Sequence, residues 1–167
     1  MVLGLSLSTF TLLHVIISLA GIGTGFIVMF GLLNGKRLDG WTAIFLATTV
    51  LTNLTGFLFP FEGFKPSYVL ATLSLIVLAI AIYARYSRRM AGSWRGTYVI
   101  TAAIALYFNC FVAVVQSFLK IPTLHPLAPT ATTEPPFLVA QTAVLAIFIW
   151  LTYRAAKRFH LGAVRTT

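Results

Sequence analysis

Acidic residues are almost missing from this sequence: three Asp and Glu stand among 167 residues, against twelve Lys and Arg. Charged residues make up 9% of the chain, whereas about 25% is typical of a soluble domain, and 59% of the residues are hydrophobic. This balance excludes an ordinary water-soluble core and indicates an integral membrane protein. In a soluble protein, the net charge of +9 would suggest a nucleic-acid partner. In an apolar chain the placement of the charges matters more, so we expect no nucleic-acid partner.

Cysteine and the common catalytic motifs are also scarce. The single cysteine, Cys110, excludes an internal disulfide, a CxxC redox pair and a multi-thiolate metal site. The sequence contains no GxxxxGK[ST], GxGxxG, HExxH or GxSxG motif, which argues against the common nucleotide-binding, zinc-protease and serine-hydrolase classes. No carboxylate falls inside a long apolar stretch, and proton-coupled transporters normally carry one there.

Five apolar stretches, each near twenty residues long, predict five transmembrane helices. A helix rises about 1.5 Å per residue, so about twenty residues cross the roughly 30 Å of hydrocarbon in a bilayer. The first stretch lacks a basic n-region and is too long for a usual h-region, so we interpret it as a span and not as a signal peptide. We predict an all-α integral membrane bundle that forms one domain over 1–167. Its spans are 8–33, 41–61, 68–86, 97–119 and 137–153.

The positive charges predict the orientation of these spans. With five spans, ten of the twelve Lys and Arg lie on one side, and only Lys65 and Lys120 lie opposite. Cytoplasmic loops attract Lys and Arg, so we predict that the N-terminus is outside and the C-terminus cytoplasmic. Trp41, Trp94 and Trp150 fall at the same helix ends, where aromatic rings collect at the level of the lipid headgroups.

Small and polar residues form a stripe along the first span. Gly21 and Gly25 make a GxxxG motif, which lets another helix backbone approach closely. Packing within the chain is the favoured interpretation, and a homodimer through this face is the alternative. Residues three and four apart share a helix face. The other members of the stripe are Thr11, His14 and Ser18.

Polar and ionisable residues gather in the outer half of the predicted bundle, where we expect the first, second and fourth helices to form a polar seam. Polar side chains in hydrocarbon are unfavourable, so they face the bundle interior or a wet cavity. We therefore predict a polar funnel, open to the periplasm and closed towards the cytoplasm, that binds a small lipophilic ligand or a partner membrane subunit. Its candidate residues are His14, Ser18, Asn53, Glu62, Asn109, Gln116, His125 and Gln141.

The outer loop 121–136 holds five of the seven prolines. Proline lacks a backbone donor and prefers extended or polyproline II geometry. The loop is either a disordered linker or an ordered strap over the outer mouth, and its length and embedded leucines favour the strap.

Two other functions stay open. A redox subunit could use His14, His125 and Glu62 at a quinol, haem or metal centre, because imidazoles and carboxylates are common ligands. The plainer interpretation of His14 is a hydrogen bond between helices, and that of His125 is a solvated loop residue. A passive transporter or channel subunit is the second alternative. We expect no metal site and no enzymatic activity, while haem and quinone stay open as cofactors.

Two stretches of the sequence resemble small uncharacterised inner-membrane proteins of bacteria. They are LDGWTAIFLATTVLTNLTGFLFPF at 38–61 and LAPTATTEPPFLVAQ at 127–141. The similarity covers most of the chain. It implies a multi-pass protein of the bacterial inner (plasma) membrane in contact with the lipid bilayer, and it implies no activity.

Overall fold

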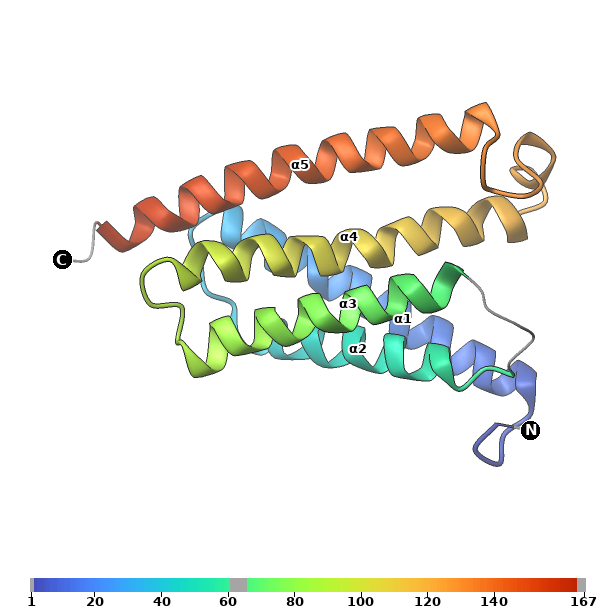
Figure 1. The fold of residues 1–167 in the computed structure, drawn as a ribbon, viewed down its shortest axis with the longest axis horizontal. Helices are drawn as coiled ribbons and strands as arrows, with labels where there is room; N and C mark the ends of the chain where they lie inside the picture. Colours follow the sequence, from blue (N-terminus) through green and yellow to red (C-terminus); the bar gives the residue numbers. More distant parts are fainter. Residues whose placement is uncertain (1, 61–65, 165–167) are drawn as a thin grey trace.

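Five α-helices make up almost all of the chain. The computed structural model describes residues 2–60 and 66–164. A π-helical turn, η1 (Tyr83–Ser87), continues the third helix, and a short 3-10 helix, η2 (His125–Leu127), lies in the loop before the fifth. Figure 1 shows the helices running side by side along the long axis, each reversing the direction of the one before. They are α1 (Leu7–Leu33), α2 (Asp39–Phe57), α3 (Pro66–Ile82), α4 (Trp94–Lys120) and α5 (Pro135–Val164).

Four of these helices are long and apolar enough to cross a membrane. The first is α1, and the second is the segment Ser67–Ser87, which contains most of α3. The third is α4, and the fourth is Pro135–Phe159 of α5. The chain is therefore a multi-pass helical membrane protein, as its composition predicts. Helix α2 is not among the four, because five threonines and Asn53 interrupt the apolar residues of this 19-residue helix.

Two helix ends differ from the prediction. Helix α2 ends at Phe57, before the predicted limit at 61. Pro60 lacks an N–H and disfavours helical geometry in the residue before it, so the helix stops short of it. Helix α5 continues from the predicted limit at 153 to Val164. It does so because Ala155 and Phe159 keep a buried face beyond the strongly apolar stretch.

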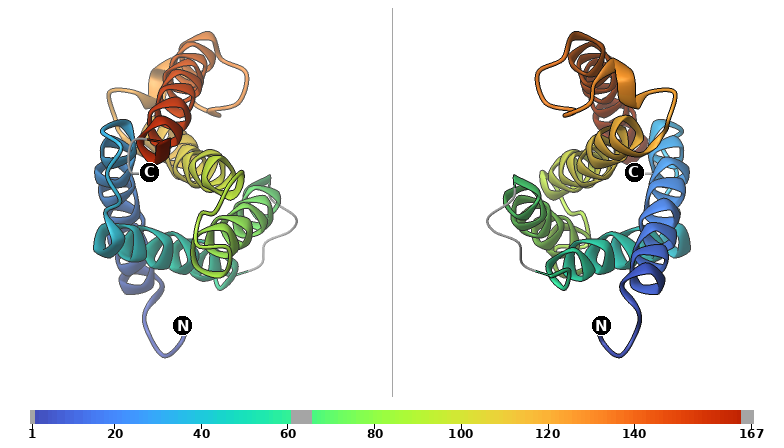
Figure 2. Two further views of the ribbon diagram at one scale, coloured as in Figure 1. Left: turned by 90° about the vertical axis from the view of Figure 1, so that its left-hand side faces the viewer. Right: turned by 90° about the vertical axis from the view of Figure 1, so that its right-hand side faces the viewer.

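The helices surround a common axis, and the apolar core fills one half of the bundle. Viewed along that axis, α1, α2, α3 and α4 follow one another, and α5 packs against both α4 and α1 (Figure 2). The main cluster of buried apolar side chains comes from the end of α1, the start of α2, the end of α3, the first half of α4 and the second half of α5. These parts share one end of the bundle. The side chains of Phe45, Leu106 and Tyr98 belong to this cluster, and each is 1% exposed or less.

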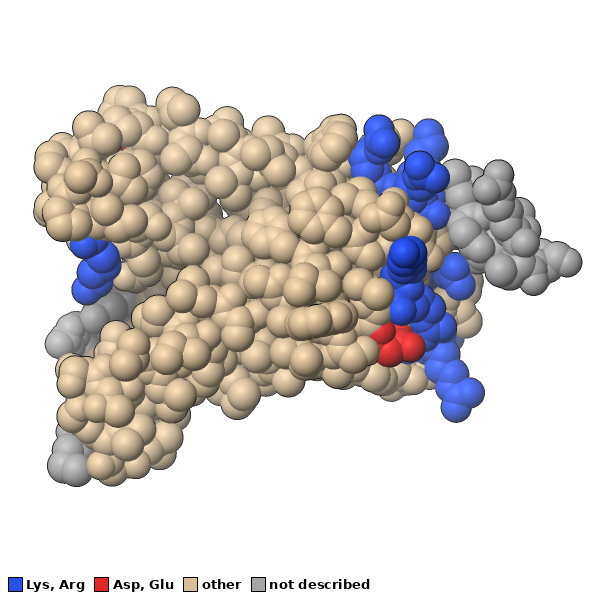
Figure 3. Space-filling view, turned by 180° about the vertical axis from the view of Figure 1, so that it is seen from behind, with Lys and Arg blue, Asp and Glu red and all other residues tan. Residues whose placement is uncertain are grey.

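Positive charge gathers at the same end. Figure 3 shows most of the described Lys and Arg side chains at one end of the molecule, with acidic atoms among them. Asp39 pairs with Arg85 there, whereas Lys120 is the last residue of α4, which ends at the opposite end. We call the end with most of the Lys and Arg the basic end and the opposite one the outer end. The basic-end residues are Lys36, Arg37, Arg85, Arg88, Arg89, Arg95, Arg154, Lys157 and Arg158.

In Figure 3 the described residues at the outer end form two lobes, and we call the space between these described residues the outer hollow. One lobe consists of the outer ends of α4 and α5 with their connecting loop, and the other contains the start of α1 and the end of α2.

Candidate functional site

His14 lies near the outer end of α1 and faces α2. Its Nδ1 lies 2.7 Å from the hydroxyl oxygen of Thr55. The Thr55 hydroxyl also lies 2.7 Å from the backbone oxygen of Leu51 and 3.1 Å from that of Thr52, so we assign its proton to this bond within the helix. With that assignment the hydroxyl oxygen accepts from His14, and the ring proton of a neutral His14 sits on Nδ1. The other nitrogen, Nε2, then carries a free lone pair.

An aromatic ring packs against the His14 imidazole. The ring of Phe59 meets it edge-on with centroids 5.2 Å apart, and Phe10 meets Phe59 at 5.0 Å. A Cβ atom placed on Gly56 would lie 3.9 Å from His14 Cε1, so the imidazole lies close above this glycine. His14 is half-buried, and its Nε2 has no hydrogen-bonding partner within residues 2–60 and 66–164. We call Phe10, His14, Thr55, Gly56 and Phe59 the outer cluster.

A second polar group, which we call the polar seam, joins α2, α3 and α4 near the middle of the bundle, whereas the predicted seam was of the first, second and fourth helices. Asn53 of α2 donates to the Ser74 hydroxyl of α3 at 3.0 Å and to the backbone oxygen of Thr49 at 2.8 Å. Asn109 of α4 donates to the Thr49 hydroxyl at 3.2 Å. All four residues are buried. Such contacts hold membrane helices in register, because an unpaired polar group is unfavourable in hydrocarbon.

The glycine pair of α1 lies against this seam and against the core. A Cβ on Gly21 would lie 3.3 Å from the hydroxyls of Thr48 and Thr49. A Cβ on Gly25 would lie 2.5 Å from Leu106 Cδ1 and 2.9 Å from the Phe45 ring. The glycine face of α1 is therefore covered by α2 and α4 of the same chain.

The remaining candidate residues lie elsewhere. Ser18 donates to the backbone oxygen of His14 at 2.7 Å. Gln141 is buried and donates to the backbone oxygen of Phe111 at 3.0 Å, joining α5 to α4. Its side-chain oxygen meets no donor in the described part of the chain. Gln116 is exposed on α4, and His125 is exposed in η2, which packs on α4.

The candidates thus divide among three places: the outer cluster, the polar seam and the outer ends of α4 and α5. No side-chain hydrogen bond between described residues connects these places. Glu62 lies outside the described residues, so its proposed partnership with His14 and His125 is a prediction. Within residues 2–60 and 66–164, no group of three or more His, Cys, Asp or Glu could hold a metal ion.

The loop before α5 folds around one carboxylate. Glu134 accepts hydrogen bonds from the Thr130 hydroxyl at 2.7 Å and from the backbone N–H groups of Thr130 and Thr132 at 2.8 and 3.0 Å. These bonds, led by that of the Thr130 hydroxyl, lower the pKa of Glu134 from 4.5 to about 2. Ala128 and Ala131 pack with the helix side chains Phe118 and Phe137. The loop is ordered, and these contacts attach it to α4 and α5.

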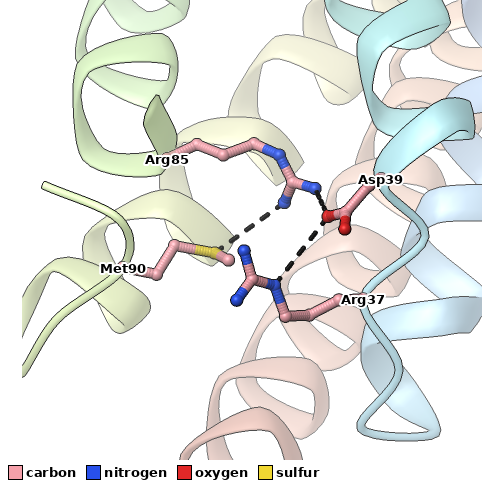
Figure 4. Close-up of polar contacts among 4 residues, drawn as sticks. All are labelled: Arg37, Asp39, Arg85 and Met90. Atoms are coloured by element: carbon pink, nitrogen blue, oxygen red, sulfur yellow. Dashed lines mark hydrogen bonds and ion pairs between the residues drawn. The ribbon is translucent and has the colours of Figure 1, made fainter. Parts of the chain in front are cut away.

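A polar contact at the basic end was missed by the sequence reasoning. Arg85, in η1, is 4% exposed and donates to the carboxylate of Asp39 at the start of α2 (Figure 4). Its guanidinium also lies 3.8 Å from the Met90 sulfur and 5.1 Å from the centre of the Tyr98 ring. The more exposed Arg37 approaches Asp39 at 3.8 Å.

Arg85 carried one sequence signal. It is the sole Lys, Arg, Asp or Glu in the apolar segment Ser67–Ser87, and Asp39 is the single acidic residue among the basic-end loops. Their pairing depends on the position of η1 beside the start of α2, which the sequence pattern does not specify. Ser74 gave even less indication, since it lies alone among aliphatic residues of α3.

No protein-family model matches the chain, and neither does any curated protein or solved structure compared with it. The resemblance of 38–61 and 127–141 to bacterial inner-membrane proteins therefore stays a prediction. The described helices support a multi-pass membrane protein on their own.

Proposed function

We propose that this chain is a bacterial inner-membrane protein whose outer hollow binds a small lipophilic ligand that carries a hydroxyl group. The observation that carries the proposal is the Nε2 of His14, which meets no hydrogen-bonding partner among the described residues and belongs to the outer part of α1. Polar groups inside membrane proteins that lack a structural partner are the usual contacts of ligands. The dense core at the basic end closes the other side.

The hydrogen bonds assigned around His14 favour a ligand that carries a donor group. When the Thr55 hydroxyl accepts the hydrogen bond from Nδ1–H, Nε2 is an acceptor, and its complement is an O–H or N–H donor. The Phe59 ring, which packs against the imidazole, favours a flat aromatic ring as its neighbour. A phenol or hydroquinone meets both conditions. The proposal needs neither His125 nor Glu62.

Five spans with the N-terminus outside are part of the proposal. Although α2 is less apolar, it lies alongside α1 and α3 and exposes large apolar side chains, including Ile44, Leu51 and Leu54. The hydroxyls of Thr48, Thr52 and Thr55 donate to carbonyls one turn earlier, so they tolerate a lipid environment. The grouping of positive charge at one end favours that end as cytoplasmic.

Cysteine labelling tests this orientation. In a Cys110→Ala background, Thr132→Cys should react with a membrane-impermeant maleimide from outside, and Ser93→Cys should react only after the membrane is opened. Both positions are exposed, so a lack of access is not expected to mask the result. The reverse pattern would refute the orientation.

Ligand binding is tested by thermal unfolding of the purified protein in detergent. We expect saturable stabilisation by 4-hexylphenol and little by 4-hexylanisole, which has the same shape but no donor. His14→Leu should abolish the difference, and Thr55→Val should reduce it, because Nδ1 then loses the partner that selects the tautomer. His125→Gln is the matched control and should retain it. Equal stabilisation by both compounds, or an unchanged difference in His14→Leu, would reject the site.

A further inference from the structure

Helix α5 is longer than the bilayer requires. It spans 30 residues, and at about 1.5 Å per residue this is about 45 Å, against roughly 30 Å of hydrocarbon. Its second half ends at the basic end of the molecule (Figure 1). We therefore place the last turns of α5 in the headgroup region on that side.

The second half of α5 has two different faces. Leu151, Ala155 and Phe159, spaced by four residues, are buried against the bundle. The outward face carries two aromatic and two basic residues at spacings of three, one and three, and all four are exposed. We call them the aromatic–basic stripe: Trp150, Tyr153, Arg154 and Lys157.

The cations of the stripe lie beside its own rings. The Arg154 guanidinium is 5.5 Å from the Trp150 ring centre, and the Lys157 ammonium is 5.9 Å from that of Tyr153. Trp150 is 56% exposed and Tyr153 62%, as expected for rings that lie among lipid headgroups. These cation–π contacts orient the two cations without neutralising them.

No acidic residue in the described part of the chain pairs with the stripe. Asp39 is the single described acid at the basic end, and its ion pairs are with Arg85 and Arg37. Arg154 and Lys157 thus face the membrane interface as uncompensated charges, four residues or fewer from aromatic rings that fix their depth. An anion at that depth is the complement of this surface.

We propose that the aromatic–basic stripe binds the phosphate of an anionic phospholipid in the leaflet at the basic end. Arg154 and Lys157 donate hydrogen bonds to the phosphate oxygens, and Trp150 and Tyr153 pack against the glycerol and upper acyl chain. The inference concerns the opposite end of the molecule from the outer hollow and does not rest on ligand binding there.

Native mass spectrometry of the full chain, released from nanodiscs with equal phosphatidylglycerol and phosphatidylcholine, tests the proposal. The parent protein should retain phosphatidylglycerol preferentially. Each Lys or Arg near an anionic surface changes binding about fivefold, so Arg154→Gln/Lys157→Gln should lower the preference by about 25-fold. Both side chains are exposed, so the variant should fold, which its unfolding temperature verifies.

The matched control removes two charges from another element of the same end: Lys36→Gln/Arg37→Gln, in the α1–α2 loop. It should keep most of the preference. An equal loss of the phosphatidylglycerol preference in both double variants would mean that the overall electrostatic field of the basic end holds the lipid. That result would overturn the proposal that the aromatic–basic stripe binds it. Absence of any preference in the parent protein would overturn it as well.

A second measurement locates the lipid. With Trp41→Phe and Trp94→Phe, the remaining fluorescence comes from Trp150. Phosphatidylglycerol brominated near the headgroup should quench it more strongly than brominated phosphatidylcholine at equal fraction. Introducing Arg154→Gln/Lys157→Gln into this background should remove the difference in quenching between the two lipids. Equal quenching by the two lipids before that change would contradict contact with the stripe.

Discussion

Replacing Asp39 with asparagine is expected to destabilise the protein by about 2 kcal/mol. Removing one partner of a fully buried ion pair costs about 3–5 kcal/mol, and an exposed pair contributes about 0–1 kcal/mol. The pair with Arg85 lies between these limits, since the arginine side chain is 4% exposed and that of Asp39 is 72% exposed. The guanidinium cannot return to water easily, whereas the carboxylate is already hydrated. The remaining contacts of Arg85 with Met90 and Tyr98 reduce the loss but supply no negative charge.

Equilibrium unfolding in mixed detergent–SDS micelles measures this free energy. Arg37→Gln is the control, because this side chain is half exposed and its nitrogen lies 3.8 Å from the same carboxylate; we expect a change below about 0.5 kcal/mol. Arg85→Met removes the buried charge itself. The double variant Asp39→Asn/Arg85→Met should be more stable than the sum of the two losses predicts, because no unpaired guanidinium is left.

Two results would refute this reasoning. If Asp39→Asn costs no more than Arg37→Gln, the buried arginine does not depend on its carboxylate. If the two losses at Asp39 and Arg85 simply add, the residues do not interact in the folded protein. Either result would leave the aromatic and sulfur contacts as the reason why Arg85 is buried.

Three further outcomes are expected. Gly25→Ala should lower the free energy of unfolding by about 1–3 kcal/mol, because the new Cβ would overlap the core. Gly23→Ala should raise the free energy of unfolding by up to about 1 kcal/mol, because Gly23 has open space around it and alanine favours the helix. Equal effects of the two variants would contradict the packing of α1. Asn109→Leu should cost about 0.6–1.7 kcal/mol in the same assay through its bond to Thr49, and no loss would remove the polar seam as a source of stability. The pKa of Glu134 is lowered to about 2, so its contribution to loop order is complete above 4.5 and is lost as the pH falls through about 2. Proteolysis of the loop by pepsin should therefore increase over that range in the parent protein, and Glu134→Gln should be sensitive at every pH tested.

The amino-acid sequence alone determined the class of this protein. Long apolar stretches, scarce acids and one-sided Lys and Arg predict membrane helices from composition and period, because hydrocarbon demands apolar surfaces over a fixed length. The helices Leu7–Leu33 and Trp94–Lys120 follow the predicted ranges within three residues at each end. Gly21 and Gly25 were likewise visible as a close-packing face, since their spacing is a property of one helix.

Tertiary structure decided which polar groups meet. Three contacts join residues more than twenty positions apart in the sequence: His14 with Thr55, Asn53 with Ser74, and Arg85 with Asp39. Helical periodicity determines the face that a residue occupies on its own helix, but not the depth or rotation of the neighbouring helix. Eight polar residues of similar predicted depth therefore looked like one funnel. The rotations of the helices instead separate the described ones among the polar seam, the outer ends of α4 and α5, and the outer cluster, where the His14 Nε2 meets no partner among the described residues.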